Sequence, residues 1–340
     1  MFAKLSLFWT IIFASIFSVQ NLNLYENYQL LQIQLLSQDD VNVLQKIVDE
    51  VENLEIDFWT PLTDFDNYDK PIIAFVPPTS ANLLIESLEK SNISYNNITD
   101  VFRKHFNNHV QMLKDKKHKM KTSKLSSTFT LNEYHTLAEI HWYMQTLSRK
   151  HPQIVKLINI GYSTEGRPLL AVKVGRNSTK NSIWIDAGMH AREWIAPATA
   201  VYLLHQLAEN YKNTKEIQSI LDKYNFYILP VVNPDGYDYS WKSERFWRKS
   251  RSKHNCTFWS CCVGVDLDRC NLGFILEFSI GQEMDWIRLF TNISLAYSIK
   301  LPPTPNEPYG FLLPEDYIVP VSIQAFEGIL NMVKSLNYFY

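Results

Sequence analysis

Short apolar segments that alternate with longer amphipathic segments constrain the second half of this chain most strongly. We expect strands at 155–161, 169–174, 183–185 and 227–232, of which 183–185 is buried. We expect one helix that ends at Arg149 and another that spans Ala196–Glu209. Strands that alternate with long helices are typical of α/β domains. The pattern therefore predicts a mixed, mostly parallel sheet covered by helices on both faces, with ligands bound at the carboxyl ends of its strands.

The N-terminal part of the chain follows another pattern: strand, helix, strand, helix, strand. Gln29–Leu36 alternates apolar and polar residues, Ile72–Val76 is a continuous apolar strand, and Asp39–Leu54 and Thr79–Lys90 have apolar residues at helical spacing. Two helices packed on a small antiparallel sheet are the simplest arrangement of these elements. We expect a ferredoxin-like α+β domain at 21–108.

The densest run of charge in the chain, Lys114–Lys124, lies between these two patterns. Such a run is usually a solvated linker. Exposed lysines on flexible chain are what a trypsin-like protease requires. We therefore expect residues 109–124 to form a cleavable basic linker, whose cleavage releases a second domain at 125–340.

The first eighteen residues, 1–18, carry one lysine and then a continuous apolar run, which is typical of a signal peptide. An uncleaved membrane anchor is the alternative, but the run is short for a membrane span. The formal net charge of -2 predicts no attraction to nucleic acid or to an anionic membrane. We expect a secreted, extracellular glycoprotein, monomeric, with sequons that start at Asn92, Asn97, Asn177, Asn255 and Asn292.

The cysteines of the chain are clustered in one short window, as Cys256, Cys261, Cys262 and Cys270. In a secreted chain this pattern favours disulfides, with three possible connectivities, whereas in the cytosol it would favour a metal site. A bond between the adjacent Cys261 and Cys262 would be strained, so each is expected to pair elsewhere.

His190 and Glu193 follow the strand at 183–185 and the turn residue Gly188. On a helical turn, side chains at i and i+3 lie on one face, so the imidazole and the carboxylate can converge on one ion. Nitrogen and carboxylate ligands suit zinc, and a catalytic zinc takes three protein ligands and a water. The pair predicts a Zn²⁺ site that needs a third ligand; a solvated histidine and glutamate at a helix start is the alternative.

The residues around this pair resemble those of a known family. Ile183–Ile195, which includes Gly-Met-His-Ala-Arg-Glu-Trp, resembles the first zinc signature of secreted metallocarboxypeptidases of the pancreatic A/B type. Asp57-Phe58-Trp59 and Val76-Pro77-Pro78 flank the middle N-terminal strand as in the activation peptide of that family, although an independent domain without a regulatory role is the alternative. The resemblance implies a zymogen activated by a trypsin-like protease, a Zn²⁺ cofactor, and peptide or protein C-termini as substrates.

The same resemblance implies roles for several further side chains. Arg248 would polarise the scissile carbonyl and stabilise its oxyanion. Arg192, Asp268 and Arg269 would contact the substrate, and Arg269 would hold the terminal carboxylate in bidentate fashion. Asp266 would accept the second N–H of the zinc-binding histidine and fix its tautomer. For each arginine, a surface salt bridge is the alternative.

The chain also departs from the family. Asp268 stands where an asparagine normally helps to bind the C-terminal carboxylate. The family's third zinc ligand is a histidine, but no histidine follows His254, and an internal block of the family is compressed to the short stretch Gly273–Asp285. Lys300 stands where the family has the glutamate that takes a proton from zinc-bound water, and an ammonium cannot do so.

The resemblance resumes after this block, with Asn292–Pro302 expected to contain the last strand and Ser322–Ser335 expected as the last helix. These observations predict a zinc metallocarboxypeptidase zymogen that releases C-terminal amino acids, in a domain with an incomplete catalytic set. The alternative is a catalytically inactive homologue that binds peptide C-termini or inhibits active carboxypeptidases.

Met284 would line the side-chain pocket by the same resemblance, which implies a preference for apolar C-terminal residues. His205 lies within an apolar helix and is expected to be a packed side chain.

Overall fold

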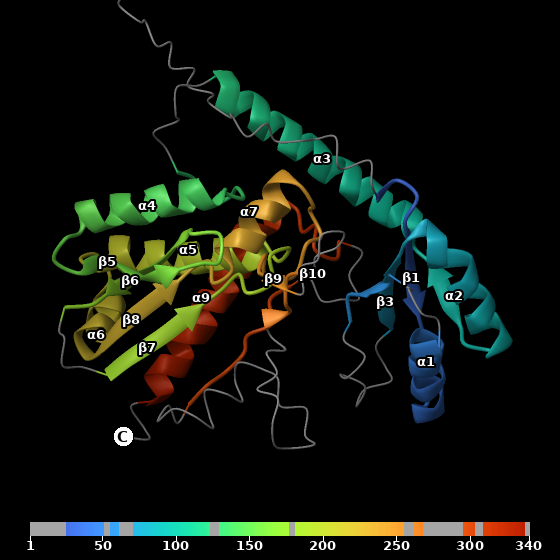
Figure 1. Cartoon of the computed structure of the whole chain (residues 1–340). Helices are drawn as coiled ribbons and strands as arrows, with labels where there is room; N and C mark the ends of the chain where they lie inside the picture. The colour runs from blue at the N-terminus through green and yellow to red at the C-terminus, as the bar shows by residue number, and fades with distance from the viewer. Residues whose placement is uncertain are drawn as a thin grey trace, which may run out of the picture.

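The structure is a computed structural model that describes residues 25–50, 55–60, 71–122, 129–176, 181–254, 262–267, 295–302 and 309–336. The described strands form two four-stranded sheets, one in each half of the chain, and a two-stranded ribbon (Figure 1). Several predictions fall outside these ranges and stay predictions; they concern residues 1–18, Asn177, Cys256, Asn255, Cys261, Asp268, Arg269, Cys270, Met284 and Asn292.

The N-terminal part of the chain forms two helices on an antiparallel sheet, as predicted, and the sheet has a fourth strand, Asp57–Phe58, in addition to the three expected. The strands, in the order in which they pair, are β2 (Asp57–Phe58), β3 (Ile72–Val76), β1 (Gln29–Ile33) and β4 (Tyr95–Asn97). The helices are α1 (Gln38–Glu50) and α2 (Pro78–Lys90). The apolar residues of α1 and α2 recur at helical spacing, so each helix has one apolar side. These sides pack against one face of the sheet and completely bury Leu44 of α1 and Leu84 of α2.

The other face of this sheet packs against the second half of the chain. Phe246 of the second half lies among aromatic rings of the first, with ring centroids 5.2 Å from Phe75, 5.7 Å from Trp59 and 5.9 Å from Phe102. Aromatic rings at these separations contribute packing beyond their buried area. The two halves therefore share an apolar core in addition to the chain that connects them.

The connection itself is a helix, α3 (Thr99–Thr122), which leaves the first sheet and runs along the second half of the molecule (Figure 1). The basic linker expected at 109–124 is helical as far as Thr122 rather than flexible chain, and its cleavage stays a prediction. The residues that face the second half recur at helical spacing, and they are His109, Met112, Leu113 and Lys116. Lys116 is anchored there, since its ammonium donates to the Tyr134 carbonyl and lies 5.5 Å from the centre of the Trp241 ring. The density of lysines hid this packed face in the sequence.

The second sheet is mixed, as predicted. In the order of pairing, its strands are β5 (Val155–Tyr162), β6 (Pro168–Val174), β8 (Tyr224–Leu229) and β7 (Asn181–Asp186). The expectation that most pairs are parallel is wrong for these strands, because only β7 and β8 are parallel. The physical reason is the short connection between β5 and β6, since a tight turn can join only antiparallel strands.

Helices and short elements complete the second half. They are α4 (Leu137–Lys150), α5 (Ile195–Asn210), α6 (Lys215–Lys223), α7 (Pro234–Lys242), β9 (Lys253–His254), β10 (Cys262–Val263), a 3-10 turn (Glu315–Tyr317) and α9 (Ile318–Ser335). α4, α5 and α9 enclose the core with the sheet residues Val172, Val174, Phe226 and Ile228. The helices predicted to end at Arg149 and to span Ala196–Glu209 are confirmed within one residue. The last helix, predicted at Ser322–Ser335, ends at Ser335 but begins four residues earlier, at Ile318.

Two local predictions in this half are wrong. Trp184 was expected inside a buried strand, but it is 45% exposed, because successive side chains of β7 alternate between the two faces and those of Ile183 and Ile185 pack against the core. The proline and glycine of the segment 233–237 are typical of a turn and predict one there, but the segment begins α7. Asn233 caps the helix and Pro234 occupies its first turn, which are positions these residues favour.

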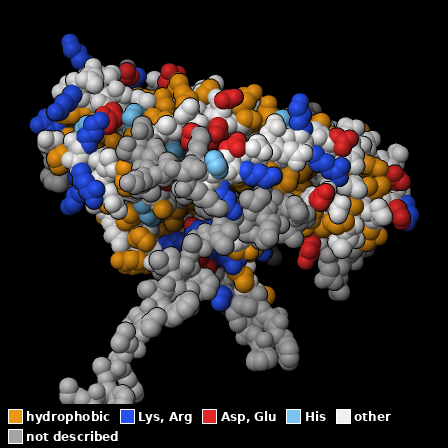
Figure 2. Space-filling model, turned by 90° about the horizontal axis from the view of Figure 1, so that it is seen from above, with side chains coloured by type: hydrophobic (Ala, Val, Ile, Leu, Met, Phe, Trp, Pro, Cys, Tyr) orange, Lys and Arg blue, Asp and Glu red, His pale blue; other side chains and the backbone are white. Residues whose placement is uncertain are grey.

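The surface carries both signs of charge. On the face drawn in Figure 2, lysine and arginine side chains lie interspersed with aspartate and glutamate side chains, in keeping with a formal net charge of -2. None of the helices in the described ranges combines the length and the apolar character of a membrane span.

Candidate active site

The turn after β7 presents His190 and Glu193 at the carboxyl end of that strand, as predicted. Gly188 has a positive φ of 67°, and a Cβ there would come within 2.9 Å of Pro197 Cγ, so the turn requires glycine. The Glu193 amide donates to the His190 carbonyl at 3.2 Å, which closes one turn of the chain. The two side chains therefore converge, with His190 Nδ1 2.9 Å from Glu193 Oε1.

Asp266, just after β10, links His190 to Arg248. Its Oδ1 lies 3.2 Å from His190 Nε2, and its Oδ2 accepts a hydrogen bond from Arg248 Nε at 3.0 Å. The contact between His190 and Asp266 is the one that the resemblance implies. The amide of Ala191 adds a backbone link, because it donates to the Arg248 carbonyl at 3.1 Å.

Electrostatics favour the charged forms of this cluster. Burial alone would lower the pKa of His190, but its hydrogen bonds with Asp266 and Glu193 outweigh burial and raise it. Burial alone would raise the pKa of Asp266, but the hydrogen bond with His190 and the charge of Arg248 outweigh burial and lower it. The pKa of Glu193 is likewise lowered, because its contact with His190 outweighs burial. The cluster therefore joins both metal-competent side chains to Asp266 and Arg248 through hydrogen bonds.

Arg192 points into the interface between the two halves of the molecule. Its side chain is 1% exposed, and it donates to both carboxylate oxygens of Asp57 in β2, one of them at 3.2 Å. The guanidinium also lies 4.1 Å from the centre of the Phe311 ring. The arginine that the resemblance assigns to substrate therefore holds a carboxylate of the N-terminal domain.

Lys300 lies in a segment that differs from the prediction. Tyr297–Leu301, which lies within the expected last strand, forms neither helix nor strand, and the Lys300 side chain is exposed. A strand needs a neighbour for its backbone groups, and no described strand pairs with this segment. By contrast, His205 is a packed side chain as predicted, with Nδ1 2.5 Å from the Tyr143 hydroxyl.

The described donors fit a zinc ion in part. His190 Nδ1 faces Glu193, and Asp266 holds the opposite ring nitrogen, an arrangement that suits a metal-bound histidine and the carboxylate that orients it. Within the described part of the chain, no three His, Cys, Asp or Glu side chains gather closely enough to hold a metal. Among the described residues, His190 and Glu193 are the side chains that would hold a zinc ion. The bound ion would supply a positive charge that polarises the carbonyl group of a substrate.

Arg245 is a buried arginine beside the candidate site, and the sequence did not predict its position there. It is 2% exposed and lies 3.8 Å from the centre of the Trp194 ring, beside the Glu193 turn. Its Nε donates to His109 Nε2 of α3 at 2.9 Å. Burial, and then the charge of Arg245, holds the pKa of His109 well below its usual range, and burial lowers the pKa of Arg245 to about 9. The only signal in the sequence was a histidine on the packed face of α3.

Two family models match the chain. A carboxypeptidase activation peptide matches residues 31–101, and a zinc carboxypeptidase matches residues 140–275. The second match ends close to Gly273, where the resemblance was expected to break.

Individual relatives agree with these models. The chain is 35% identical to carboxypeptidase A2 of Mus musculus over 246 residues, which cover 71% of this chain and 55% of the relative. It is 34% identical to carboxypeptidase A6 of Homo sapiens over 218 residues, which cover 64% of this chain and 48% of the relative. The chain thus spans about half the length of the curated relatives it matches. The crystal structure of thrombin activatable fibrinolysis inhibitor matches the fold, with a TM-score of 0.70, 23% identity, and coverage of 91% of this chain and 98% of that chain.

Proposed function

Because this chain belongs to the zinc carboxypeptidase family and carries that family's activation peptide, we propose that it is held latent by its N-terminal domain and acts on peptide C-termini once that domain is displaced. The observation that carries the proposal is the burial of Arg192 against Asp57. A guanidinium binds carboxylates in a bidentate geometry, so a carboxylate of the activation domain occupies a place that a substrate group could take.

The finer activity that we propose is the zinc-dependent release of C-terminal amino acids. His190 and Glu193 would hold the ion, and Asp266 would fix the orientation of the histidine. Arg248 is tied to the same aspartate, so its positive charge would lie where an oxyanion develops. Arg269 would bind the terminal carboxylate, a trypsin-like protease would cleave near the end of α3, and the protein would be secreted.

A second candidate function is favoured by two observations. By the resemblance, Lys300 stands at the position of the family's general base, and the described residues offer two candidate zinc ligands where a catalytic site takes three. A protein with these features would bind peptide C-termini through its arginines without hydrolysis. In that case its free N-terminal domain could also inhibit active carboxypeptidases.

The two candidates separate in one experiment. The chain is cleaved with trypsin and incubated with a peptide that has an apolar C-terminal residue, and the products are identified by mass spectrometry. Stepwise loss of C-terminal residues that stops with a chelator, and that is missing in the cleaved His190→Ala variant and in the intact chain, supports the enzyme. Binding of the intact peptide without loss of residues supports the binder. If the cleaved chain neither shortens nor binds the peptide, both candidates are wrong.

A further inference from the structure

We propose that Asn233 is a positioning residue that fixes the His190–Glu193 turn relative to Arg248. The inference rests on the proposed function of that site. Asn233 is 3% exposed and lies at the N-terminus of α7, between the two segments that carry these side chains. It touches neither the metal-competent atoms nor the guanidinium, so any effect on chemistry passes through the backbone that it holds.

The hydrogen bonds of the Asn233 amide join three segments. Its Oδ1 accepts from the Gly236 amide at 3.0 Å and so caps α7. Its Nδ2 donates to the Met189 carbonyl at 3.0 Å and to the Lys249 carbonyl at 2.9 Å. Met189 immediately precedes His190, and Lys249 immediately follows Arg248. One buried side chain therefore uses both of its donors to hold the two functional segments at one separation.

Close packing at Gly236 restricts the same junction. A Cβ on Gly236 would come within 2.5 Å of Asn233 Nδ2, 2.6 Å of the Lys249 carbonyl and 2.9 Å of Ala191 Cβ. The first turn of α7 is thus in contact with both functional segments, with no room for a side chain between them. A displacement of either segment would have to move α7 or break a hydrogen bond of Asn233.

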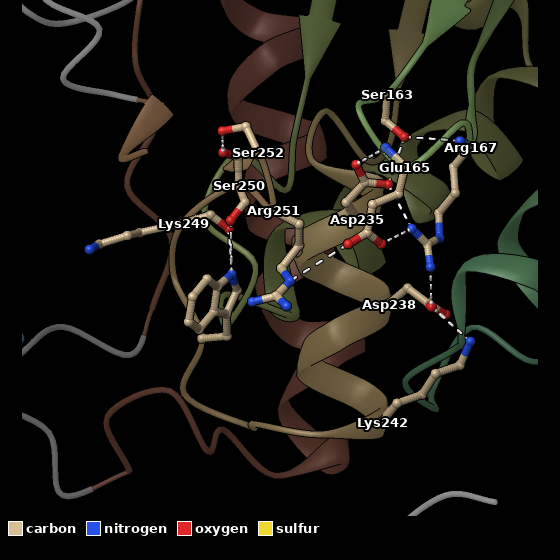
Figure 3. Close-up of polar contacts among 12 residues, drawn as sticks. Ser163, Glu165, Arg167, Asp235, Asp238, Lys242, Lys249, Ser250, Arg251 and Ser252 are labelled. Atoms are coloured by element: carbon tan, nitrogen blue, oxygen red, sulfur yellow. Dashed lines mark hydrogen bonds and ion pairs between the residues drawn. The ribbon is translucent and has the colours of Figure 1, made fainter. Parts of the chain in front are cut away.

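α7 is itself anchored to the second sheet (Figure 3). Asp235, which is 3% exposed, accepts from the Ser163 hydroxyl at 2.6 Å, from the Glu165 amide at 3.0 Å and from Arg167 Nη1 at 2.7 Å. Arg167 also donates from Nη2 to Asp238, one turn further along α7, at 2.9 Å. Because these bonds involve charged partners and are largely shielded from water, they hold the helix firmly to the turn between β5 and β6. Asn233 is therefore a fixed point from which the site is built.

The test uses the full-length chain with the substitution Asn233→Asp. Aspartate caps a helix about as well as asparagine, so α7 keeps its cap, but both donors are lost and a negative oxygen faces two carbonyls. The matched control is Thr136→Ala, which removes the cap of α4, a helix that contacts neither functional segment through that residue. Two quantities are measured: amide hydrogen exchange at Ala191, whose N–H is bonded to the Arg248 carbonyl, and the zinc dissociation constant by competition with a chromogenic chelator.

We expect Asn233→Asp to accelerate exchange at Ala191 at least tenfold while Val172, in the centre of the sheet, keeps its wild-type rate. The zinc dissociation constant should rise about 10- to 100-fold, the range found when groups that orient metal ligands are removed. Thr136→Ala should accelerate exchange only in the first turn of α4 and leave zinc binding unchanged.

The outcomes separate this inference from the proposed function. Wild-type exchange at Ala191 in Asn233→Asp would overturn the positioning role. Faster exchange at Ala191 with unchanged zinc binding would show that Asn233 holds the backbone without affecting the site, which also overturns the inference. If the wild-type chain binds no zinc, the proposed enzymatic function fails, while exchange at Ala191 still decides whether Asn233 fixes the two segments.

Discussion

Acid should destabilise the folded chain through His109, the α3 residue that contacts the second domain. His109 is 6% exposed and accepts a hydrogen bond from Arg245 Nε, so it must be neutral in the folded state. Burial, and then the charge of Arg245, keeps the pKa of His109 well below 6.5. The unfolded chain therefore binds the proton first. The contribution of His109 to stability is complete above about pH 6.5 and decreases as the pH falls below that value.

The expected magnitude follows from linkage. A group costs about 1.4 kcal/mol per pH unit between its unfolded and its folded pKa. Between pH 6.5 and 5, allowing for the rounded start of the titration, His109 should lower the free energy of unfolding by about 1–2 kcal/mol. His109→Gln removes this pH-dependent contribution to the free energy of unfolding, because glutamine does not titrate. Its side-chain oxygen can still accept a hydrogen bond from Arg245. Arg192, Tyr134 and Tyr237 also act on the charge of Arg245, and they are present in both proteins.

The assay is urea denaturation, followed by tryptophan fluorescence, at several pH values from 5 to 7.5. Burial also lowers the pKa of His105, His141 and His205, so the informative quantity is the difference between wild type and His109→Gln. His118→Gln, at an exposed position of the same helix, is the control and should follow the wild type. A difference between wild type and His109→Gln that stays constant from pH 7.5 to 5 would refute the reasoning.

Further changes test the interface and the packing of α7. Asp57→Asn leaves Arg192 buried without its carboxylate and should lower the free energy of unfolding by about 3 kcal/mol, which is the low end for a buried pair because Asp57 is partly exposed. In the same urea assay the exposed Asp39→Asn should have no effect. Equal stabilities of these two variants would contradict this account. Gly236→Ala forces a Cβ against the Lys249 carbonyl and should lower the free energy of unfolding by about 1–3 kcal/mol. Gly328→Ala lies in open space within α9 and should raise it by about 1 kcal/mol. Thermal denaturation that ranks the two variants in the opposite order would rule out the packing argument.

Local patterns in the sequence predicted the parts of the fold that depend on local physics. The apolar run Ile72–Val76 forms a strand with the predicted bounds, and α5 follows its helical periodicity. The spacing of His190 and Glu193 brought the two side chains together because one turn of chain suffices for that contact. These features needed no knowledge of distant residues.

Contacts between distant residues could not be predicted in the same way. Arg192 and Asp57 are 135 residues apart, and Arg245 and His109 are 136 apart, so no spacing rule connects them. The helical end of α3 was missed because its packed face is diluted by lysines. The short connection between β5 and β6 indicates that they are antiparallel, but the antiparallel pair of β6 and β8 could not be predicted, because apolar runs do not reveal the relative direction of strands that are not consecutive.

The measurement that tests the central claim most directly compares peptides with a free and an amidated C-terminus. Binding of each peptide to the intact and to the linker-cleaved chain is measured by fluorescence anisotropy, with a chelator present to prevent hydrolysis. We predict that the cleaved chain binds the free C-terminus at least tenfold more tightly than the amide, and that the intact chain binds both weakly because Asp57 covers Arg192. Equal binding of the two peptides by the cleaved chain would contradict a site for peptide C-termini.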